Sequence, residues 1–397
     1  MYKRILEGIR VVDMGRFIAA PFCGQILADM GAEVIRLERP GGDVDRQRGP
    51  LTPSGRSLYY LCMNRNKKAV TLDMRSEEGK EVFTKLLGVT DVLLHNFSPG
   101  AAKTMGLQYE VLKEVNPSII CAAISGFGSD GPYAERVAFD MVAQGMSGAM
   151  STTGFSENGP TAAHIPYCDY GTALNAALGI VLALYHRERT GVGQAFDLSL
   201  LDVGVSFVAG FAIAAEYQMS GKVRGQDGNQ TVYAVGNSYK AKDGYISLSV
   251  IGNAMWAKLC GAVGHPEMAK DERFSSDIRR YENRDLVSKA LGRWIAQHTV
   301  EEGVTMLQGA GVPSGPVLDI KQMVADPQVG IRNMLFPAPD PELGSVLVPG
   351  TTIKFSKTPG VVERGAPDTG ESNREIYQGL LGYSNERIEN LKAKKVI

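Results

Sequence analysis

The sequence of 397 residues lacks the cysteine patterns of disulfide frameworks and zinc sites. No Cys-x-x-Cys pair occurs, and no histidine stands at metal-ligand spacing to another histidine or to a cysteine. These absences predict a reduced, cytoplasmic protein without a bound metal. The cysteines are scattered and odd in number: Cys23, Cys62, Cys121, Cys168 and Cys260.

The chain also lacks an excess of either charge and a long hydrophobic run. Its 42 basic and 43 acidic residues leave a formal net charge of −1. This balance argues against a nucleic-acid or membrane-surface partner selected by bulk electrostatics. The longest uncharged runs, 170–185 and 203–215, are interpreted as buried helices that are too short and too polar to span a bilayer. The N-terminal stretch has no signal-peptide core.

Several common catalytic motifs are missing as well. There is no G-x-S-x-G, no P-loop and no H-E-x-x-H, so the commonest classes of hydrolase, NTPase and metalloprotease are excluded. No G-x-G-x-x-G follows the first expected strand, which argues against a dinucleotide-binding version of an α/β fold.

What is present is a regular alternation of short apolar runs with amphipathic segments. Right-handed crossovers make such β-α-β units parallel, so the pattern predicts a doubly wound α/β domain. Strands are expected at 8–15, 32–42, 68–74, 91–97 and 118–128, and helices at 19–31 and 76–89.

The pattern changes in the middle of the chain. Residues 221–237 are polar, glycine-rich and without periodicity, which indicates a linker. A hairpin is predicted over 238–250, with Asp243 and Gly244 at its turn. Charged helical segments follow, so a smaller α+β domain is expected over 238–329.

One acidic residue stands before a long helix. Asp169 lies in PYCDYGTALNAALGIVLALYH (166–186), whose apolar residues recur at helical spacing from Leu174 to Tyr185. An aspartate there can cap the helix, because it accepts hydrogen bonds from free N–H groups and meets the positive end of the dipole. The same geometry would keep a carboxylate ionised and present it as a nucleophile. The local residues leave both roles open.

Three glycine-containing loops follow expected strands: 38–43, 96–106 and 125–140. In doubly wound folds, ligands bind at these strand ends. Basic residues near the loops could hold a phosphorylated ligand. They are Arg39, Lys67, Lys68, Lys103 and Arg136.

Longer motifs point to a family. GIRVVDMGRFIAAPFCGQILADMGAEVIRLERPGGD, VLLHNFSPGAAKTMGL, ISGFGSDGPYAERVAFDMVAQGMSG and YKAKDGYISL occur in this order. With them the whole chain resembles the class III coenzyme A transferases, the family of carnitine, bile-acid and formyl-CoA transferases. The resemblance implies a Rossmann-like CoA-binding domain from 1–220 and 330–397, a linker at 221–237 and a small domain at 238–329. It also implies an interlocked homodimer.

The activity implied is transfer of CoA from an acyl-CoA to a free carboxylic acid, with CoA as substrate and no tightly bound cofactor. The resemblance makes Asp169 the nucleophile, which forms a mixed anhydride and then an aspartyl-CoA thioester. Asp140 is either a supporting acid or a helix cap. Backbone N–H groups near Gly171, or in 225–237, are candidate oxyanion donors. The CoA contacts that the motifs imply are Arg39, Lys67, Asn96, Phe97, Lys103 and Arg136.

Two positions depart from related patterns. Phe139 stands where acyl-CoA racemases carry an acid/base histidine, which favours a transferase over a racemase. Ile18 stands where formyl-CoA transferases carry a glutamine, and their four-glycine run is missing, so oxalate/formate exchange is disfavoured. A racemase and a non-catalytic acyl-CoA-binding protein remain the alternatives. The sequence does not identify the two acids.

Overall fold

The structure, a computed structural model, describes residues 4–397, which form two compact units. The first unit contains the chain up to Ala149 together with Ala163–Gly221 and Pro327–Ile397. The second contains Met150–Ala162 and Lys222–Asp326. Two segments therefore differ from the sequence analysis: 150–162 groups with the second unit, and so does the stretch expected to be a linker.

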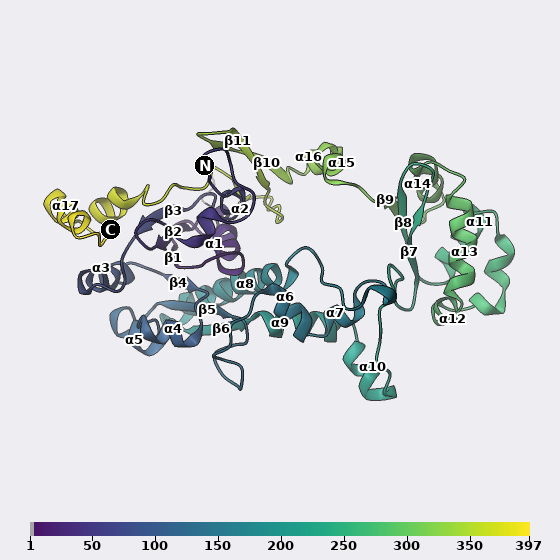
Figure 1. Ribbon diagram of the computed structural model, residues 1–397, viewed down its shortest axis with the longest axis horizontal. Helices are drawn as coiled ribbons and strands as arrows, with labels where there is room; N and C mark the ends of the chain where they lie inside the picture. Colours follow the sequence, from purple (N-terminus) through teal and green to yellow (C-terminus); the bar gives the residue numbers. More distant parts are fainter. Residues whose placement is uncertain (1–3) are drawn as a thin grey trace. The chain divides into compact units, whose positions relative to one another are not determined.

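A six-stranded sheet forms the centre of the first unit (Figure 1). Every neighbouring pair is parallel, and the order is β3-β2-β1-β4-β5-β6. This is the Rossmann-like order, and it confirms the predicted doubly wound α/β class. The strands are β1 (Arg10–Asp13), β2 (Glu33–Glu38), β3 (Lys68–Thr71), β4 (Val92–His95), β5 (Ile120–Ser125) and β6 (Ala195–Ser199).

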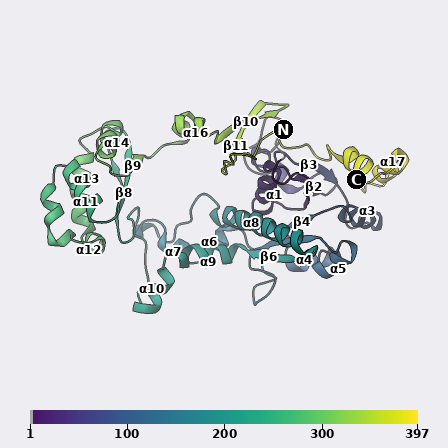
Figure 2. The same ribbon diagram turned by 180° about the vertical axis from the view of Figure 1, so that it is seen from behind.

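Helices cover both faces of this sheet, as Figures 1 and 2 show from opposite sides. Because successive strand residues point to opposite faces, Val11 joins one buried core and Val12 the other. On one face lie α1 (Ala19–Asp29) and α8 (Tyr167–Thr190). The other face carries α3 (Glu77–Leu87), α5 (Tyr109–Val115), the π-helix Glu375–Leu380 and α17 (Asn385–Ala393).

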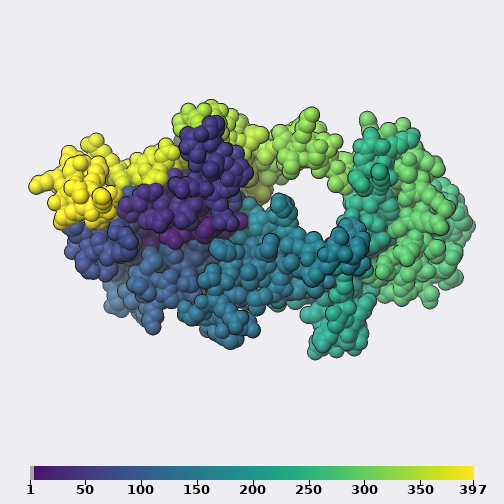
Figure 3. Space-filling view, viewed as in Figure 1, coloured from purple at the N-terminus to yellow at the C-terminus, as the bar shows by residue number. Residues whose placement is uncertain are grey.

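The C-terminal residues, yellow in Figure 3, lie beside α3, although the two segments are far apart in the sequence. The Asp73 N–H donates to the Val396 carbonyl at 2.7 Å. Glu78, in the first turn of α3, pairs with Lys394 at 2.8 Å and with Arg387 at 3.3 Å. The C-terminal segment thus completes the layer that contains α3, and its last residues lie beside Asp73, which follows β3.

Helix α8 packs through its small residues and not through the bulky leucines that mark its helical spacing. Its buried residues are small: Ala173, Ala176, Ala177, Ile180 and Ala183. The bulkier Leu174, Leu178 and Leu182 are 53%, 57% and 58% exposed in this chain. Small side chains let the helix approach α1 and the sheet closely, so they take the inner face.

The interpretation of the two uncharged runs also needs correction. By length and composition α8 could cross a membrane, and 44% of its apolar window is buried in the structure. The second run is broken into α9 (Leu200–Gly210) and α10 (Ile213–Ser220), bent by 63° at Ala212, whose φ is 63°.

The second unit contains the predicted hairpin. Strands β7 (Val235–Lys240) and β8 (Tyr245–Val250) pair antiparallel around the Asp243-Gly244 turn, and β9 (Ser314–Pro316) adds to β8. The Asp243 carboxylate accepts from the Val300 N–H at 2.8 Å, which ties the turn to α14. Its helices are α11 (Asn253–Ala262), α12 (Asp277–Glu282), α13 (Arg284–Ile295), α14 (Val300–Gly309) and α15 (Ile320–Ala325).

Short elements connect these layers. In the first unit they are α2 (Leu58–Met63), α4 (Pro99–Thr104), α6 (Asp140–Met146), α16 (Pro327–Ile331), and the antiparallel pair β10 (Leu335–Asp340) and β11 (Gly344–Pro349). Helix α7 spans Ala149–Thr152.

Candidate active site

Asp169 is the third residue of α8, but it does not cap the helix. The cap comes from Asp140, the first residue of α6. Asp140 Oδ1 accepts from the N–H groups of Cys168 and Asp169 at 2.9 and 3.2 Å. Gln144 holds the other Asp140 oxygen at 2.5 Å. The expected capping role thus belongs to Asp140, and among residues 4–397 no hydrogen bond to the Asp169 carboxylate is found.

The charge state of Asp169 also differs from the expectation that the helix start would keep it ionised. Burial, and to a smaller extent the negative charge of Asp140, raises the pKa of the Asp169 carboxyl to about 7. Because Asp140 occupies the N–H groups at the helix start, desolvation outweighs the dipole. A carboxylate that accepts few stabilising hydrogen bonds is a stronger nucleophile once it is ionised.

Asp169 lines a cavity of about 260 Å³. The strand ends of β1, β4 and β5 contribute its walls, as expected for the point where the strand order reverses. Two predicted contacts, Asn96 and Phe97, line it after β4, and Arg136 lines it from the glycine-rich loop. Phe139 closes another side.

A second cavity, of about 710 Å³, lies at the ends of β2 and β3. Arg16 and Phe97 line both cavities, so the two meet at these residues. The second cavity contains the predicted Arg39 in its Gly41-Gly42 loop. It also contains basic residues that sequence analysis missed: Arg16, Arg75, Lys394 and Lys395.

Asn96 fixes the loop between β1 and α1. Its side-chain oxygen accepts from the Arg16 N–H at 2.8 Å, and its amide donates to the Arg16 carbonyl at 2.7 Å. The next residue, Phe17, has a φ of 66°, in the left-handed region that a bulky residue rarely adopts. Asn96 therefore positions Arg16 and Phe17 at the cavity, and its contact with CoA stays a prediction.

Lys67 is not available as a CoA contact, which corrects the prediction. Its side chain is fully buried, and its ammonium group donates to Asp13 Oδ2, the Pro21 carbonyl and Asn64 Oδ1 at 2.7, 2.8 and 2.9 Å. All three donors of a lysine are then used inside the protein. Asp13 is the last residue of β1, so its ion pair with Lys67 holds the start of the loop that follows this strand.

Gly171 does not fit its predicted role as an oxyanion donor, whereas the predicted CoA contact of Lys103 stays a prediction. The Gly171 N–H lies inside α8, where helical geometry directs it to the Tyr167 carbonyl, so it cannot serve as an oxyanion donor. A Cβ at Gly171 would lie 2.8 Å from the Phe207 ring, so glycine is needed for the approach of α9.

Lys103 lines a different cavity, of about 330 Å³, and not the one that contains Asp169. The candidate donors in 225–237 lie in the second unit.

The site thus joins a half-buried carboxylate to a basic cavity at the carboxyl edge of a Rossmann-like sheet, which is suited to acyl transfer from a phosphorylated carrier. The family model "CoA-transferase family III" matches residues 6–373, and the chain belongs to this family.

Curated relatives match along the whole chain. A succinyl-CoA–D-citramalate CoA-transferase of Chloroflexus aurantiacus is 36% identical, with 99% of this chain and 98% of the relative covered. A formyl-CoA:oxalate CoA-transferase of Streptomyces coelicolor is 34% identical, with 100% of both covered. The human succinyl-CoA:glutarate CoA-transferase is 32% identical, with 99% and 90% covered. This protein is accordingly a CoA-transferase.

Solved structures agree with this assignment. A CAIB/BAIF family protein from Brucella suis has a TM-score of 0.83 and 34% identity, with 95% of this chain and 99% of that one covered. A protein from M. tuberculosis has a TM-score of 0.82 and 30% identity, with 94% and 99% covered.

Proposed function

We propose that this protein moves CoA between two carboxylic acids through covalent intermediates on Asp169. The family supports acyl-CoA:carboxylate transfer in general. The observation that carries the covalent route is the placement of a carboxylate that accepts no hydrogen bond among residues 4–397 in a cavity that meets a larger basic one. A basic cavity attracts the phosphates of CoA. Because the two cavities meet, the thioester of the same molecule can then lie beside Asp169.

In this proposal the nucleotide part of CoA lies in the larger cavity. Lys395 supplies positive charge to its phosphates. Arg39, Arg75 and Lys394 add to this charge, and each of them also pairs with a carboxylate of the protein. The pantetheine arm then passes Phe97 and Arg16, whose guanidinium lies 5.2 Å from the centre of the Phe97 ring. Both residues line the two cavities, which fits a long, narrow substrate that runs from one to the other.

The proposed reaction begins when ionised Asp169 attacks the thioester carbonyl. The C–S bond breaks, the CoA thiolate leaves, and a mixed anhydride forms. The thiolate then attacks the aspartyl carbonyl of the anhydride and releases the first acid as a carboxylate. This leaves an aspartyl-CoA thioester, which keeps the energy of the original thioester.

The second half reverses these steps with another acid. The acceptor carboxylate attacks the aspartyl-CoA thioester and expels the thiolate, which gives a second anhydride. The thiolate attacks the acceptor's acyl carbon, so the new acyl-CoA forms and Asp169 is released as a carboxylate. No net proton is taken up or lost, so the site needs an ionised nucleophile rather than an acid/base pair.

The racemase alternative lacks a second acid/base group here. Asp169 is the one titratable acid among the residues that line its cavity, and no histidine is among them. Phe139 packs its ring against Phe17, with centroids 5.5 Å apart at 90°. Epimerisation by two bases needs groups on both sides of the α-carbon.

We also propose that the enzyme works in the cytoplasm as a homodimer. The exposed leucines of α8 support the second part, because an apolar stripe of this kind marks an interaction surface. The names of several relatives contain succinyl-CoA, which makes it the first donor to test.

The covalent route can be tested by mass spectrometry. The protein is incubated with succinyl-, butyryl- or cinnamoyl-CoA, treated with hydroxylamine and digested. We expect a hydroxamate on the peptide that contains Asp169, because hydroxylamine captures an aspartyl thioester or anhydride. Asp169→Ala should abolish the adduct and turnover, whereas Glu389→Gln, at an exposed residue of α17, should retain both. Turnover without any adduct, or an adduct in Asp169→Ala, would contradict the route.

A further inference from the structure

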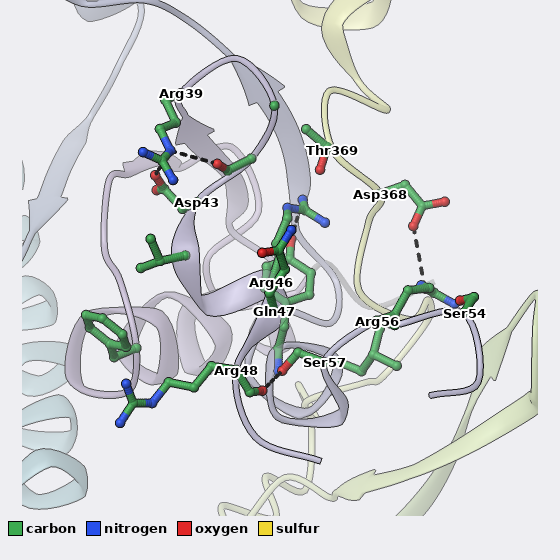
Figure 4. Close-up of a pocket in the computed structure, with 17 residues that line it drawn as sticks. Arg39, Asp43, Arg46, Gln47, Arg48, Ser54, Arg56, Ser57, Asp368 and Thr369 are labelled. Carbon is green, nitrogen blue, oxygen red and sulfur yellow. Dashed lines mark hydrogen bonds and ion pairs between the residues drawn. The ribbon is translucent and has the colours of Figure 1, made fainter. Parts of the chain in front are cut away.

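One large cavity plays no part in the proposed mechanism. It has a volume of about 820 Å³ and lies between the loops after β2 and before α2 (Figure 4). Its lining is rich in arginine: Arg39, Arg46, Arg48 and Arg56. Such a concentration of guanidinium groups indicates an anionic ligand unless each already has a partner.

Three of these arginines do have carboxylate partners. Arg46 holds both oxygens of Glu38, at 2.5 and 2.8 Å. Arg56 pairs with Asp340 at 2.9 Å. Arg39 lies 3.8 Å from Asp43 and donates to the Gly42 carbonyl at 2.9 Å. Among residues 4–397, no carboxylate pairs with Arg48. The cavity therefore contains one guanidinium whose charge the protein does not neutralise directly.

The backbone of Arg48 is anchored, whereas its charged end is not. The Ser57 hydroxyl donates to the Arg48 carbonyl, and the Arg48 N–H donates to the Asp45 carbonyl at 3.4 Å. Figure 4 shows the Arg48 side chain pointing away from Arg46 and Arg56. Its guanidinium lies 5.4 Å from the centre of the Phe17 ring.

Phe17 connects Arg48 to the nucleophile. Its ring lines both the arginine-rich cavity and the cavity of Asp169, and its strained backbone is held by the Asn96-fixed loop. Tyr59 gives a second link. Burial raises the pKa of its phenol; the charge of Asp169 adds to this rise and that of Arg48 opposes it. Arg48 and Asp169 thus both act on the same side chain.

We propose that Arg48 binds a second carboxylate, on the acid whose first carboxyl carbon reacts at Asp169. The inference rests on the proposed function, and it makes Arg48 a specificity-determining residue for dicarboxylic acids and their CoA monothioesters. A guanidinium matches a carboxylate with two parallel hydrogen bonds. Since the leaving and entering acids occupy the acyl site in turn, one arginine can select both.

A phosphate of CoA is the competing ligand. Arg39, Gly41 and Gly42 line the arginine-rich cavity as well as the proposed nucleotide cavity. If Arg48 held a phosphate, its loss would weaken every acyl-CoA alike. If it holds a second carboxylate, only donors and acceptors that carry that group are affected. Two donors of equal chain length therefore separate these roles.

The experiment compares succinyl-CoA with butyryl-CoA, each with propionate as acceptor. The wild-type protein should favour succinyl-CoA in kcat/KM by about 100-fold, because a site built for a charged group discriminates strongly against its absence. Arg48→Met should lower kcat/KM for succinyl-CoA by about 100-fold and change that for butyryl-CoA by less than about threefold. Arg48→Lys should retain part of the preference, since the charge remains without the planar fork.

Arg374→Met is the matched control. Arg374 is exposed and donates to Gln378 at 2.9 Å, and its replacement should alter neither donor. An equal loss for both donors in Arg48→Met would overturn the assignment and favour a phosphate contact. A wild-type protein with equal activity on both donors would overturn it while leaving the proposed function intact. No turnover and no Asp169 adduct with any donor would overturn both.

Discussion

At the scale of single residues, Asp169 and its neighbour Asp140 have separate tasks. Asp140 caps α8 from another helix, and Asp169 is left partly buried with a pKa of about 7. The sequence suggested both acids but could not divide the tasks between them. Capping by a residue 29 positions away depends on how α6 approaches α8, and no local pattern encodes that approach.

This division predicts a shift in the pH profile of Asp140→Asn. Asp169 must be ionised to attack, so kcat/KM should rise with pH through a value near 7 in the wild-type protein. The negative charge of Asp140 raises this pKa, and its removal should move the acid limb to lower pH. Asparagine keeps a side-chain oxygen for the N–H groups of Cys168 and Asp169, so the unfolding free energy should change by less than about 1 kcal/mol.

The measurements are kcat/KM between pH 5 and pH 9 and urea unfolding, with Glu389→Gln as control. An acid limb that stays in place, or that moves to higher pH, would show that Asp140 does not act on Asp169 through its charge.

At the scale of elements, patterns of hydrophobicity placed strands and helices well. The strands β1 to β5 fall inside the predicted ranges because parallel strands buried on both faces are continuous apolar runs. Helix α3 lies inside the predicted range 76–89, and Ser76 caps it by accepting from the Gly79 N–H at 3.0 Å. The sequence predicted helix α8 but not which of its residues face the sheet, because periodicity shows that a helix has an apolar face without showing which neighbour that face contacts.

Gly171 allows a test of the α8 packing. A Cβ there would lie 2.8 Å from Phe207 and 2.9 Å from Val203. Gly171→Ala should therefore lower the unfolding free energy by about 1–3 kcal/mol through overpacking, as measured in urea. Gly210→Ala is the control, since a Cβ at Gly210 meets no atom within 4 Å. Equal unfolding free energies of the two variants would mean that α9 moves to make room for the added methyl group without loss of stability.

At the scale of the whole molecule, chain segments from both ends build the first unit and its basic cavity. Arg75 follows β3, whereas Lys394 and Lys395 come from the last residues of the chain. These lysines have no sequence motif that marks a binding site. Only the packing of α17 on the sheet places them beside the loop that contains Arg39.

The proposed homodimer gives a prediction at the same scale. Leu178→Glu places a charge in the exposed apolar stripe of α8, so it should convert a dimer into a monomer because burying an unpaired carboxylate is costly. Light scattering coupled to size-exclusion chromatography measures the mass. Val111→Glu, at a residue 50% exposed on α5, should remain dimeric. A monomeric wild-type protein would rule out this assembly.

The sequence by itself determined the fold class and the family, and it predicted Asp169 as the central acid. These depend on local periodicity and on ordered motifs, which short stretches of chain carry. Tertiary structure decided that Asp140 caps α8, that Lys67 is sealed inside, and that Arg48 and Lys394 face cavities near the site. The reason is physical: hydrogen-bond partners, burial and charge neighbours arise from segments that meet only when the sheet is assembled.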